Sequence, residues 1–266
     1  EQRDPKKLIR GYPKIFEGTI EEFHNLAEHS YRGGMFENYQ RGLIKEPLFD
    51  YDINSAYPFE MTKLPHWGNG RFMECSEPSS MEVTEYGWYL CEFDCPYIPF
   101  ADTLNTYKIE YLFKNFHNEF KTGIEHNDEI TALDDNSAMD VRAVTNPRIL
   151  YPTGVRRQVV TKIEYEFMKK HNFYCEFLSG FEWLEFKDKY ESPFAWVENM
   201  FKERLFYKYV TKEDMKQYSL KITLNSTYGK TAQQRPFKGK FTNFFYASYI
   251  TAGVRIRLAE IIHKYK

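Results

Sequence analysis

One stretch constrains the fold of this chain more than any other, because it combines a strand pattern, a carboxylate and a tight turn. It reads Leu-Phe-Asp-Tyr-Asp-Ile-Asn-Ser-Ala-Tyr-Pro over residues 48–58. Asn54 and Ser55 are turn formers, and Pro58 suits the first turn of a helix. The pattern predicts a buried strand that ends at Asp52, with backbone N–H groups exposed at the turn that follows. Such a carboxylate and such amides can together hold a divalent cation and a polyphosphate.

Two other interpretations of this stretch stay open. In the first, Asp50 and Asp52 are alternate polar residues on one face of a half-buried strand and cap the turn after it. In the second, the two carboxylates face the same way and form the two-metal site of a nuclease. The nuclease interpretation leaves a second pattern, over residues 221–229, unexplained.

This second pattern, Lys-Ile-Thr-Leu-Asn-Ser-Thr-Tyr-Gly, predicts a helix with one functional face. Lys221, Asn225 and Tyr228 are spaced by four and three residues, so they project from the same side of a helix. Gly229 is a typical residue just beyond a helix C-terminus. A lysine can neutralise a phosphate, an asparagine offers a polar contact, and a tyrosine offers a flat surface to a base.

Both stretches resemble motifs of the family B DNA polymerases, specifically those of the protein-primed branch. The Asp-x-x-Ser-x-Tyr-Pro pattern of residues 52–58 resembles motif A, and the Lys-x-x-x-Asn-Ser-x-Tyr-Gly pattern of residues 221–229 resembles motif B. A third element, Tyr-Arg-Gly-Gly at residues 31–34, resembles the Tyr-x-Gly-Gly signature between the exonuclease and polymerase domains of that branch. The three follow one another in the family's order, and the resemblance extends from about Tyr31 to the C-terminus.

The resemblance implies a role for each matching residue. Asp52 would be the catalytic metal ligand, with the Ile53 carbonyl beside it, in a two-metal Mg²⁺ site. The implied dNTP contacts are Asn54, Ser55, Tyr57, Arg204, Lys208, Lys221, Asn225 and Tyr228. The implied DNA contacts are Tyr31, Arg32, Gly33, Gly34, Gly229 and Lys230. Outside these motifs, Tyr57 and Tyr228 would be read as residues that only pack at helix ends.

The implied fold is α+β: a polymerase palm, whose antiparallel sheet packs on helices, with helical fingers and an inserted subdomain. The expected division is a remnant of a preceding region at 1–30, palm at 31–100, an insertion resembling the terminal-protein-contacting subdomain at 101–150, palm at 151–193, fingers at 194–230, and a palm return at 231–266 that leads toward motif C.

Local patterns predict the individual elements. We expect helices over 19–29, 194–209, 212–228 and 247–266, and strands over 88–93, 174–178 and 241–245. Apolar residues from Val159 to Met168 follow helical spacing. Thr211 is the expected cap of the helix that follows it.

Charge is distributed unevenly along the chain, although the formal net charge is only −2. Residues 201–240 carry ten Lys/Arg against three acids, a net of +7, and residues 101–140 carry nine acids against three Lys, a net of −6. The basic stretch suits a surface facing phosphates, or else a solvated helix face. Aromatic residues, 18% of the chain, suit a core and stacking on bases.

Other features limit the cellular setting. Four cysteines form neither a zinc pattern nor a disulfide framework, so we expect reduced thiols. No apolar run approaches the roughly 18 residues of a membrane span, and the start is not that of a signal peptide. We therefore expect no membrane association or secretion, and a cytoplasmic or virus-associated location in a host cell.

Two-metal nucleotidyl transfer needs a second carboxylate besides Asp52. In the family it comes from a Tyr-x-Asp-Thr-Asp-Ser hairpin, which this sequence does not contain, and Asp134-Asp135 is a poor substitute. We therefore expect a polymerase fragment without exonuclease domain, motif C and thumb, inactive by itself, from a truncated or naturally split protein. The expected partners are primer–template DNA and dNTP, with a terminal protein and a second polypeptide carrying motif C as candidates. The alternative is a catalytically dead DNA-binding module that keeps the fold.

Overall fold

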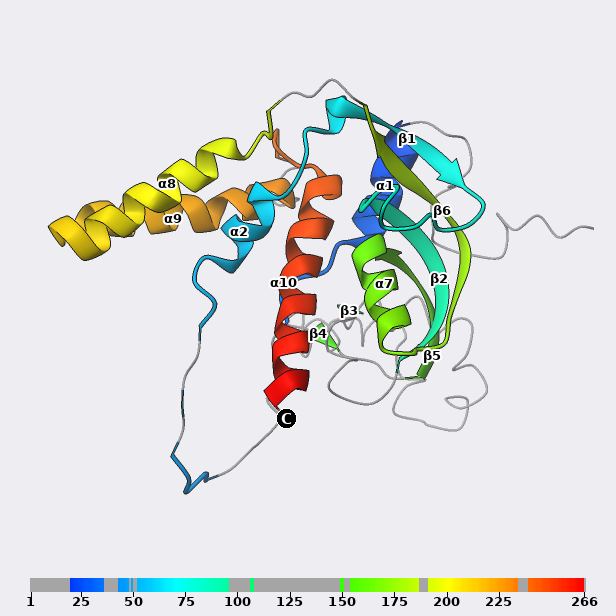
Figure 1. Ribbon diagram of the computed structural model, residues 1–266, viewed down its shortest axis with the longest axis horizontal. Helices are drawn as coiled ribbons and strands as arrows, with labels where there is room; N and C mark the ends of the chain where they lie inside the picture. The colour runs from blue at the N-terminus through cyan, green and yellow to red at the C-terminus, as the bar shows by residue number, and fades with distance from the viewer. Residues whose placement is uncertain are drawn as a thin grey trace, which may run out of the picture.

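Four antiparallel strands form the central sheet of the computed structural model (Figure 1). In chain order they are β1 (Gly70–Cys75), β2 (Gly87–Cys95), β5 (Gly154–Thr161) and β6 (Cys175–Glu185), and in the sheet they are arranged β1-β6-β2-β5. The structure describes residues 20–35, 43–47, 49, 52–95, 106–107, 149–150, 154–186, 191–233 and 239–265.

β2 lies between two neighbouring strands and is buried on both faces. Trp88 and Leu90 point into one core, together with Phe181 of β6, whereas Tyr89 and Cys91 point into a second core on the other face. This alternation follows from the two-residue period of a strand. The sequence predicts this strand at 88–93 from its alternating pattern, and β2 confirms it.

Helices cover both faces of the sheet. α1 (Ile20–Ser30) contributes Phe23 and Leu26 to the first core, and α7 (Lys162–Lys170) contributes Phe167 and Met168 to the second. The long C-terminal helix α10 (Phe244–Tyr265) runs beside α7 and reaches both cores (Figure 1). The sheet and these helices form the α+β body that the sequence predicts.

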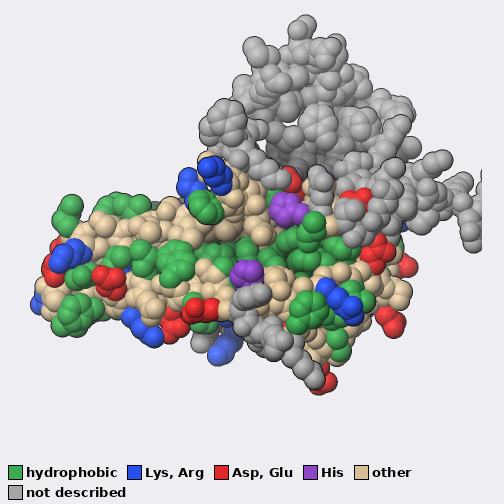
Figure 2. Space-filling view, turned by 90° about the horizontal axis from the view of Figure 1, so that it is seen from above, with side chains coloured by type: hydrophobic (Ala, Val, Ile, Leu, Met, Phe, Trp, Pro, Cys, Tyr) green, Lys and Arg blue, Asp and Glu red, His purple; other side chains and the backbone are tan. Residues whose placement is uncertain are grey.

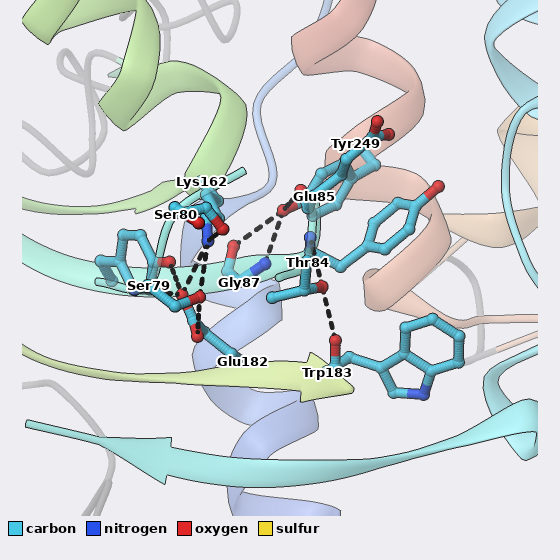
Figure 3. A network of polar contacts seen from close by, with 11 residues as sticks. Ser79, Ser80, Thr84, Glu85, Gly87, Lys162, Glu182, Trp183 and Tyr249 are labelled. Atoms are coloured by element: carbon cyan, nitrogen blue, oxygen red, sulfur yellow. Dashed lines mark hydrogen bonds and ion pairs between the residues drawn. The ribbon is translucent and has the colours of Figure 1, made fainter. Parts of the chain in front are cut away.

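A buried polar network fastens the segment between β1 and β2 to this body (Figure 3). The Lys162 ammonium lies 2.9 Å from Glu182 Oε1, and both side chains are buried. Ser79 donates through its hydroxyl to Glu182 Oε2 at 2.6 Å, and Lys162 also donates to Ser79 Oγ at 3.0 Å. The Tyr249 hydroxyl of α10 accepts from the Gly87 N–H at 2.7 Å. Charges removed from water are therefore paired and hydrogen-bonded, as burial requires.

A pair of helices projects from the sheet body (Figure 1). α8 (Ala195–Phe206) runs outward, a π-helical turn η4 (Tyr207–Thr211) reverses the chain, and α9 (Asp214–Thr231) returns beside α8. The short helix α2 (Ala56–Thr62) packs against both and against α10. Few residues of the pair are buried. Figure 2 shows hydrophobic side chains at its surface. Phe206, Val210 and Met215 are among the exposed hydrophobic residues of the pair.

Three local predictions are wrong. The strand expected at 241–245 is absent, because Asn243 Oδ1 accepts from the backbone N–H groups of Phe245 (3.0 Å) and Tyr246 (3.4 Å) and starts α10 there. Thr211 belongs to η4, and the residue preceding α9 is Glu213. Val159 lies in β5, since α7 begins only after Thr161, whose capping box with Glu164 fixes the helix start.

The acidic insertion predicted at 101–150 lies outside the described residues, except for its two ends. There β3 (Thr106–Tyr107) pairs antiparallel with β4 (Ile149–Leu150). Residues 1–19 also lie outside the description. In the part of the chain that the structure describes, no helix has both the length and the apolar character needed to cross a bilayer.

Candidate functional site

The turn before α2 takes an unusual backbone conformation. Ser55 has φ 50° and ψ 45°, in the left-handed region that non-glycine residues seldom adopt, and its carbonyl accepts from the Phe59 N–H at 3.0 Å. Asp52, three residues earlier, is exposed and lies outside any strand, contrary to prediction. The four strands of the main sheet come from other parts of the chain, whereas Asp50 and Tyr51 fall outside the description.

Tyr57 joins α2 to α9. Its ring stacks on that of Tyr228, with centroids 4.1 Å apart and planes inclined by 13°. Burial raises the pKa of Tyr57, the neighbouring Tyr228 raises it further, and the positive charge of Arg255 acts in the opposite direction. The segments resembling motifs A and B, far apart in the sequence, therefore meet ring to ring.

A cation from α8 reaches the same place. Arg204, on the last turn of α8, donates from Nη1 to the Ser55 hydroxyl at 3.1 Å. Its Nε is buried and has no hydrogen-bond partner among the described residues. The helical pair thus approaches the turn before α2 with a guanidinium whose donors are only partly used.

The Tyr-Arg-Gly-Gly loop lies on the other side of Tyr57. A Cβ atom added at Gly34 would collide with the Tyr57 hydroxyl, so glycine permits this close approach. Tyr31 is half-buried and its ring lies 5.6 Å from that of Phe244. All three motif segments therefore converge on Tyr57.

A buried ion pair that the sequence did not indicate holds this loop. Arg255 of α10 donates from Nη1 to the carbonyls of Arg32 and Gly33, both at 2.9 Å, and from Nη2 to Glu164 at 2.5 Å. The side chains of Arg255 and Glu164 are fully buried. Glu164 Oε2 also accepts from the N–H and the hydroxyl of Thr161, both at 2.8 Å. No spacing marks these residues, because they come from two distant helices.

The remaining predicted residues are placed less centrally. Lys221 and Asn225 are exposed on α9, whereas Leu224 between them is buried. Lys208 lies in η4 with its ammonium 4.9 Å from the Tyr209 ring centroid, at the end of the helical pair away from the sheet (Figure 1). Arg32 is only 3% exposed, and its Nη1 donates to the Ser30 carbonyl at 2.7 Å.

The end of the motif B helix differs from prediction. Gly229 does not end the helix, since α9 continues to Thr231 and a Cβ at Gly229 would meet nothing within 4 Å. Glycine is only modestly unfavourable within a helix, so neighbouring contacts can extend the helix past it. One such contact is the hydrogen bond that the Asn243 N–H donates to the Thr231 carbonyl at 2.8 Å. Lys230 is exposed and donates to Gln233 at 2.8 Å.

The described residues do not complete a metal site. Within the described ranges, no three or more His, Cys, Asp or Glu side chains are grouped so that they could hold a metal ion. Asp52 supplies one exposed carboxylate and Ile53 one carbonyl, which is fewer oxygen ligands than Mg²⁺ requires.

Comparison with known proteins shows the family to which the chain belongs. The model of the family described as DNA polymerase type B, organellar and viral, matches residues 6–242. The chain belongs to this family. It is 26% identical over 254 residues to a DNA polymerase of Acidianus bottle-shaped virus (isolate Italy/Pozzuoli), an alignment covering 92% of this chain and 31% of that polymerase. The chain therefore spans about a third of this relative.

A solved structure shares the fold. Phi29 DNA polymerase, complexed with primer–template DNA in a post-translocation binary complex, superposes with a TM-score of 0.51 and 17% identity, over 93% of this chain and 41% of that one. At this identity the likeness concerns the fold alone. The predicted α+β polymerase fold and the family resemblance are confirmed, while the roles of individual residues remain predictions.

Proposed function

We propose that this chain is the palm-and-fingers part of a DNA-directed DNA polymerase of the protein-primed type. In this proposal the junction of α2, α8 and α9 binds the incoming dNTP, and the loop at residues 31–34 faces the primer–template. The observation that carries it is the Tyr57–Tyr228 stack, because it joins the two motif segments that would share a nucleotide. Membership of the family supplies the reaction class.

The side chains around this junction suit a nucleoside triphosphate. Arg204, with an unused buried donor among the described contacts, and the exposed Lys221 would neutralise phosphate charge. Tyr57 and Tyr228 present aromatic surface to the sugar and the base pair, and Asn225 adds a polar contact. Lys208 lies in η4, so it would contact the triphosphate only if the helical pair moved toward α2.

On the DNA side, the arrangement favours backbone contacts. The buried Arg255 fixes the carbonyls of Arg32 and Gly33, which leaves Tyr31, Gly34 and the exposed Lys230 as the groups for primer–template contact. Arg32 would act through its backbone, since its side chain is buried.

Asp52 would supply one carboxylate to a Mg²⁺ site whose remaining ligands lie elsewhere. We therefore expect no appreciable primer extension by residues 1–266 alone with dNTP and Mg²⁺. A second polypeptide carrying motif C, and a terminal protein, are the partners that the proposal admits. Robust extension by this chain alone would contradict this part of the proposal.

Thermal unfolding with and without dNTP, Mg²⁺ and primer–template tests the nucleotide site. A ligand at 100 times its Kd stabilises the folded state by about 2.7 kcal/mol, which corresponds to a Tm increase of about 5–10 °C for a chain of this size. Lys221→Ala should lose most of this increase. The matched control is Lys169→Ala, because Lys169 is an exposed lysine on α7.

The same measurement separates the alternative of a catalytically dead DNA-binding module. That module would bind DNA with a steep salt dependence but would gain no stability from dNTP and Mg²⁺. Equal Tm increases in wild type, Lys221→Ala and Lys169→Ala would place the nucleotide away from α9.

A further inference from the structure

A groove lies between the start of α8, the end of α9 and the turn into α10. It encloses about 560 Å³ and is open to solvent on one side. Apart from Lys230, none of the residues predicted to bind dNTP or DNA lines it. The proposed nucleotide and DNA contacts therefore do not explain which residues line this groove.

Two aromatic side chains on its rim are exposed. Trp196 is 42% exposed and Phe241 is 75% exposed, although burial of such side chains is normally favourable. The Trp196 indole N–H donates to the Pro193 carbonyl at 2.9 Å, which fixes the orientation of the ring. Flat apolar surface is thus held open at the groove, where a second flat group could cover it.

The walls of the groove are already ordered. Tyr246 packs edge-on against Phe194, with centroids 4.9 Å apart, and donates through its hydroxyl to the Pro65 carbonyl at 3.2 Å. Thr242 donates through its hydroxyl to the Gln233 carbonyl at 2.7 Å, which ties the turn to the end of α9. A ligand would therefore meet a preformed surface and lose little binding energy in ordering it.

Charge around the groove favours an anion. Lys230 and Lys240 line it, and none of the described lining residues is acidic. A second cavity, of about 320 Å³ between α2, α7 and α10, differs in having acidic lining residues, since Glu60, Glu85 and Glu260 line it together with Lys63 and Arg257. Cations beside exposed aromatic rings are the chemistry that binds single-stranded nucleic acid.

We propose that this groove is a stacking site for an unpaired nucleotide of single-stranded DNA. Its base covers the Trp196 and Phe241 rings, and its phosphates lie at Lys230 and Lys240. The choice of DNA rests on the proposed polymerase function, whereas the groove itself is distinct from the junction around Tyr57. A strand held there would leave the junction free for a nucleotide.

Tryptophan fluorescence tests the site in the full chain. The sequence has four tryptophans, and Trp67, Trp88 and Trp183 are buried, so acrylamide quenching reports mainly on Trp196. We expect a short oligo(dT) to quench the emission and to shield Trp196 from acrylamide, with no such effect from a blunt duplex. Trp196→Phe removes the signal while keeping a ring, and it should bind oligo(dT) within about threefold of wild type.

Affinity for labelled oligo(dT), measured by fluorescence anisotropy, completes the test. Trp196→Ala and Phe241→Ala should each weaken binding by about tenfold. Lys240→Gln should lower the slope of log K against log salt by about 0.7. The matched controls are Tyr174→Ala, an exposed aromatic residue just before β6, and Lys169→Gln, and both should bind as wild type does. Circular dichroism checks that each variant is folded.

Unchanged affinity of the two alanine variants, or unshielded Trp196 in the bound state, would overturn the proposal. Quenching by an acidic peptide equal to that by oligo(dT) would also overturn it. These failures are distinguishable from failure of the proposed function, because the dNTP-dependent Tm increase and its loss in Lys221→Ala do not depend on this groove.

Discussion

The sheet body contains two buried ion pairs beside its more exposed ones, whereas the ion pairs described within the projecting helical pair are all largely exposed. In the body, Lys162 with Glu182 and Arg255 with Glu164 form ion pairs whose side chains are almost wholly buried. In the pair, Lys202 with Glu198 and Lys216 with Glu213 form ion pairs that are largely exposed. Buried pairs hold one geometry, whereas exposed pairs contribute little stability and exchange readily with solvent. The body thus fixes positions, and the pair presents cations.

This difference suits the roles proposed for the two regions, namely DNA contact by the body and nucleotide binding beside the helical pair. The loop at residues 31–34 depends on Arg255 for its position, and an ordered DNA-facing surface requires such support. Within α8 and α9, by contrast, only Val197, Leu224 and Thr231 are buried. A helical element with so small a core can shift against α2 at low cost.

The largest effect is expected where a buried charge loses its partner. Arg255→Ala leaves Glu164 charged and buried and frees the Arg32 and Gly33 carbonyls, so the free energy of unfolding should fall by about 3–5 kcal/mol. Urea denaturation followed by circular dichroism measures this loss. Arg257→Ala, two residues along the same helix and exposed, should cost less than about 1 kcal/mol. Similar losses in both variants would mean that the buried pair does not anchor the loop.

The buried pair of Lys162 and Glu182 should make the free energy of unfolding depend on pH. Burial tends to raise the pKa of Glu182, but hydrogen bonds from Ser79, Tyr89 and Lys162, with the Lys162 charge, outweigh it and hold the pKa below the ordinary value of a glutamate. A lowered carboxyl pKa stabilises the folded state above the unfolded value, and this stability is lost as pH falls through the folded value.

The corresponding measurement is the free energy of unfolding between pH 7 and pH 3. Wild type should lose stability toward acid, and Glu182→Gln, which does not titrate, should show a shallower decline. Glu198→Gln, which alters an exposed pair of α8, should keep the wild-type slope. Parallel curves for wild type and Glu182→Gln would contradict the assignment.

A smaller effect is expected at the Tyr57–Tyr228 stack, which joins α2 to α9 of the helical pair. Tyr57→Ala and Tyr228→Ala each remove one ring of the stack, so a double-mutant cycle should give a coupling free energy of about 0.5–1.5 kcal/mol. The control cycle pairs Tyr57→Ala with Tyr218→Ala, an exposed residue elsewhere on α9, and should be additive. A coupling near zero for Tyr57 with Tyr228 would mean that the rings do not stack in solution.

Sequence periodicity predicted the elements that have strong local patterns. The alternating pattern at 88–93 and the helical spacing at 19–29 correspond to β2 and α1, because the period of the side chains differs between a strand and a helix. The two helices predicted at 194–209 and 212–228 correspond to α8 and α9 of the projecting pair. The strand predicted at 241–245 failed because a single capping residue, Asn243, decided the local structure.

The site was less accessible to sequence reasoning. Motif spacing identified Tyr57, Tyr228 and Gly34 as candidate site residues. It did not identify Arg255 or Glu164, because their ion pair forms only when α7 and α10 pack together. The left-handed Ser55 was equally hidden, since turn chemistry predicts that the chain reverses but not through which dihedral angles. Tertiary contacts between distant segments determined these features.

The central claim, that a nucleotide binds where α2 meets α9, is tested most directly by photo-crosslinking. Azido-dATP would be bound to the full chain with primer–template and Mg²⁺, irradiated, and the labelled peptides mapped by mass spectrometry, with excess dATP as competitor. We expect competed label on residues 52–62 and 214–231. Competed label confined to the sheet or to α7, with none on α2 or α9, would contradict the account.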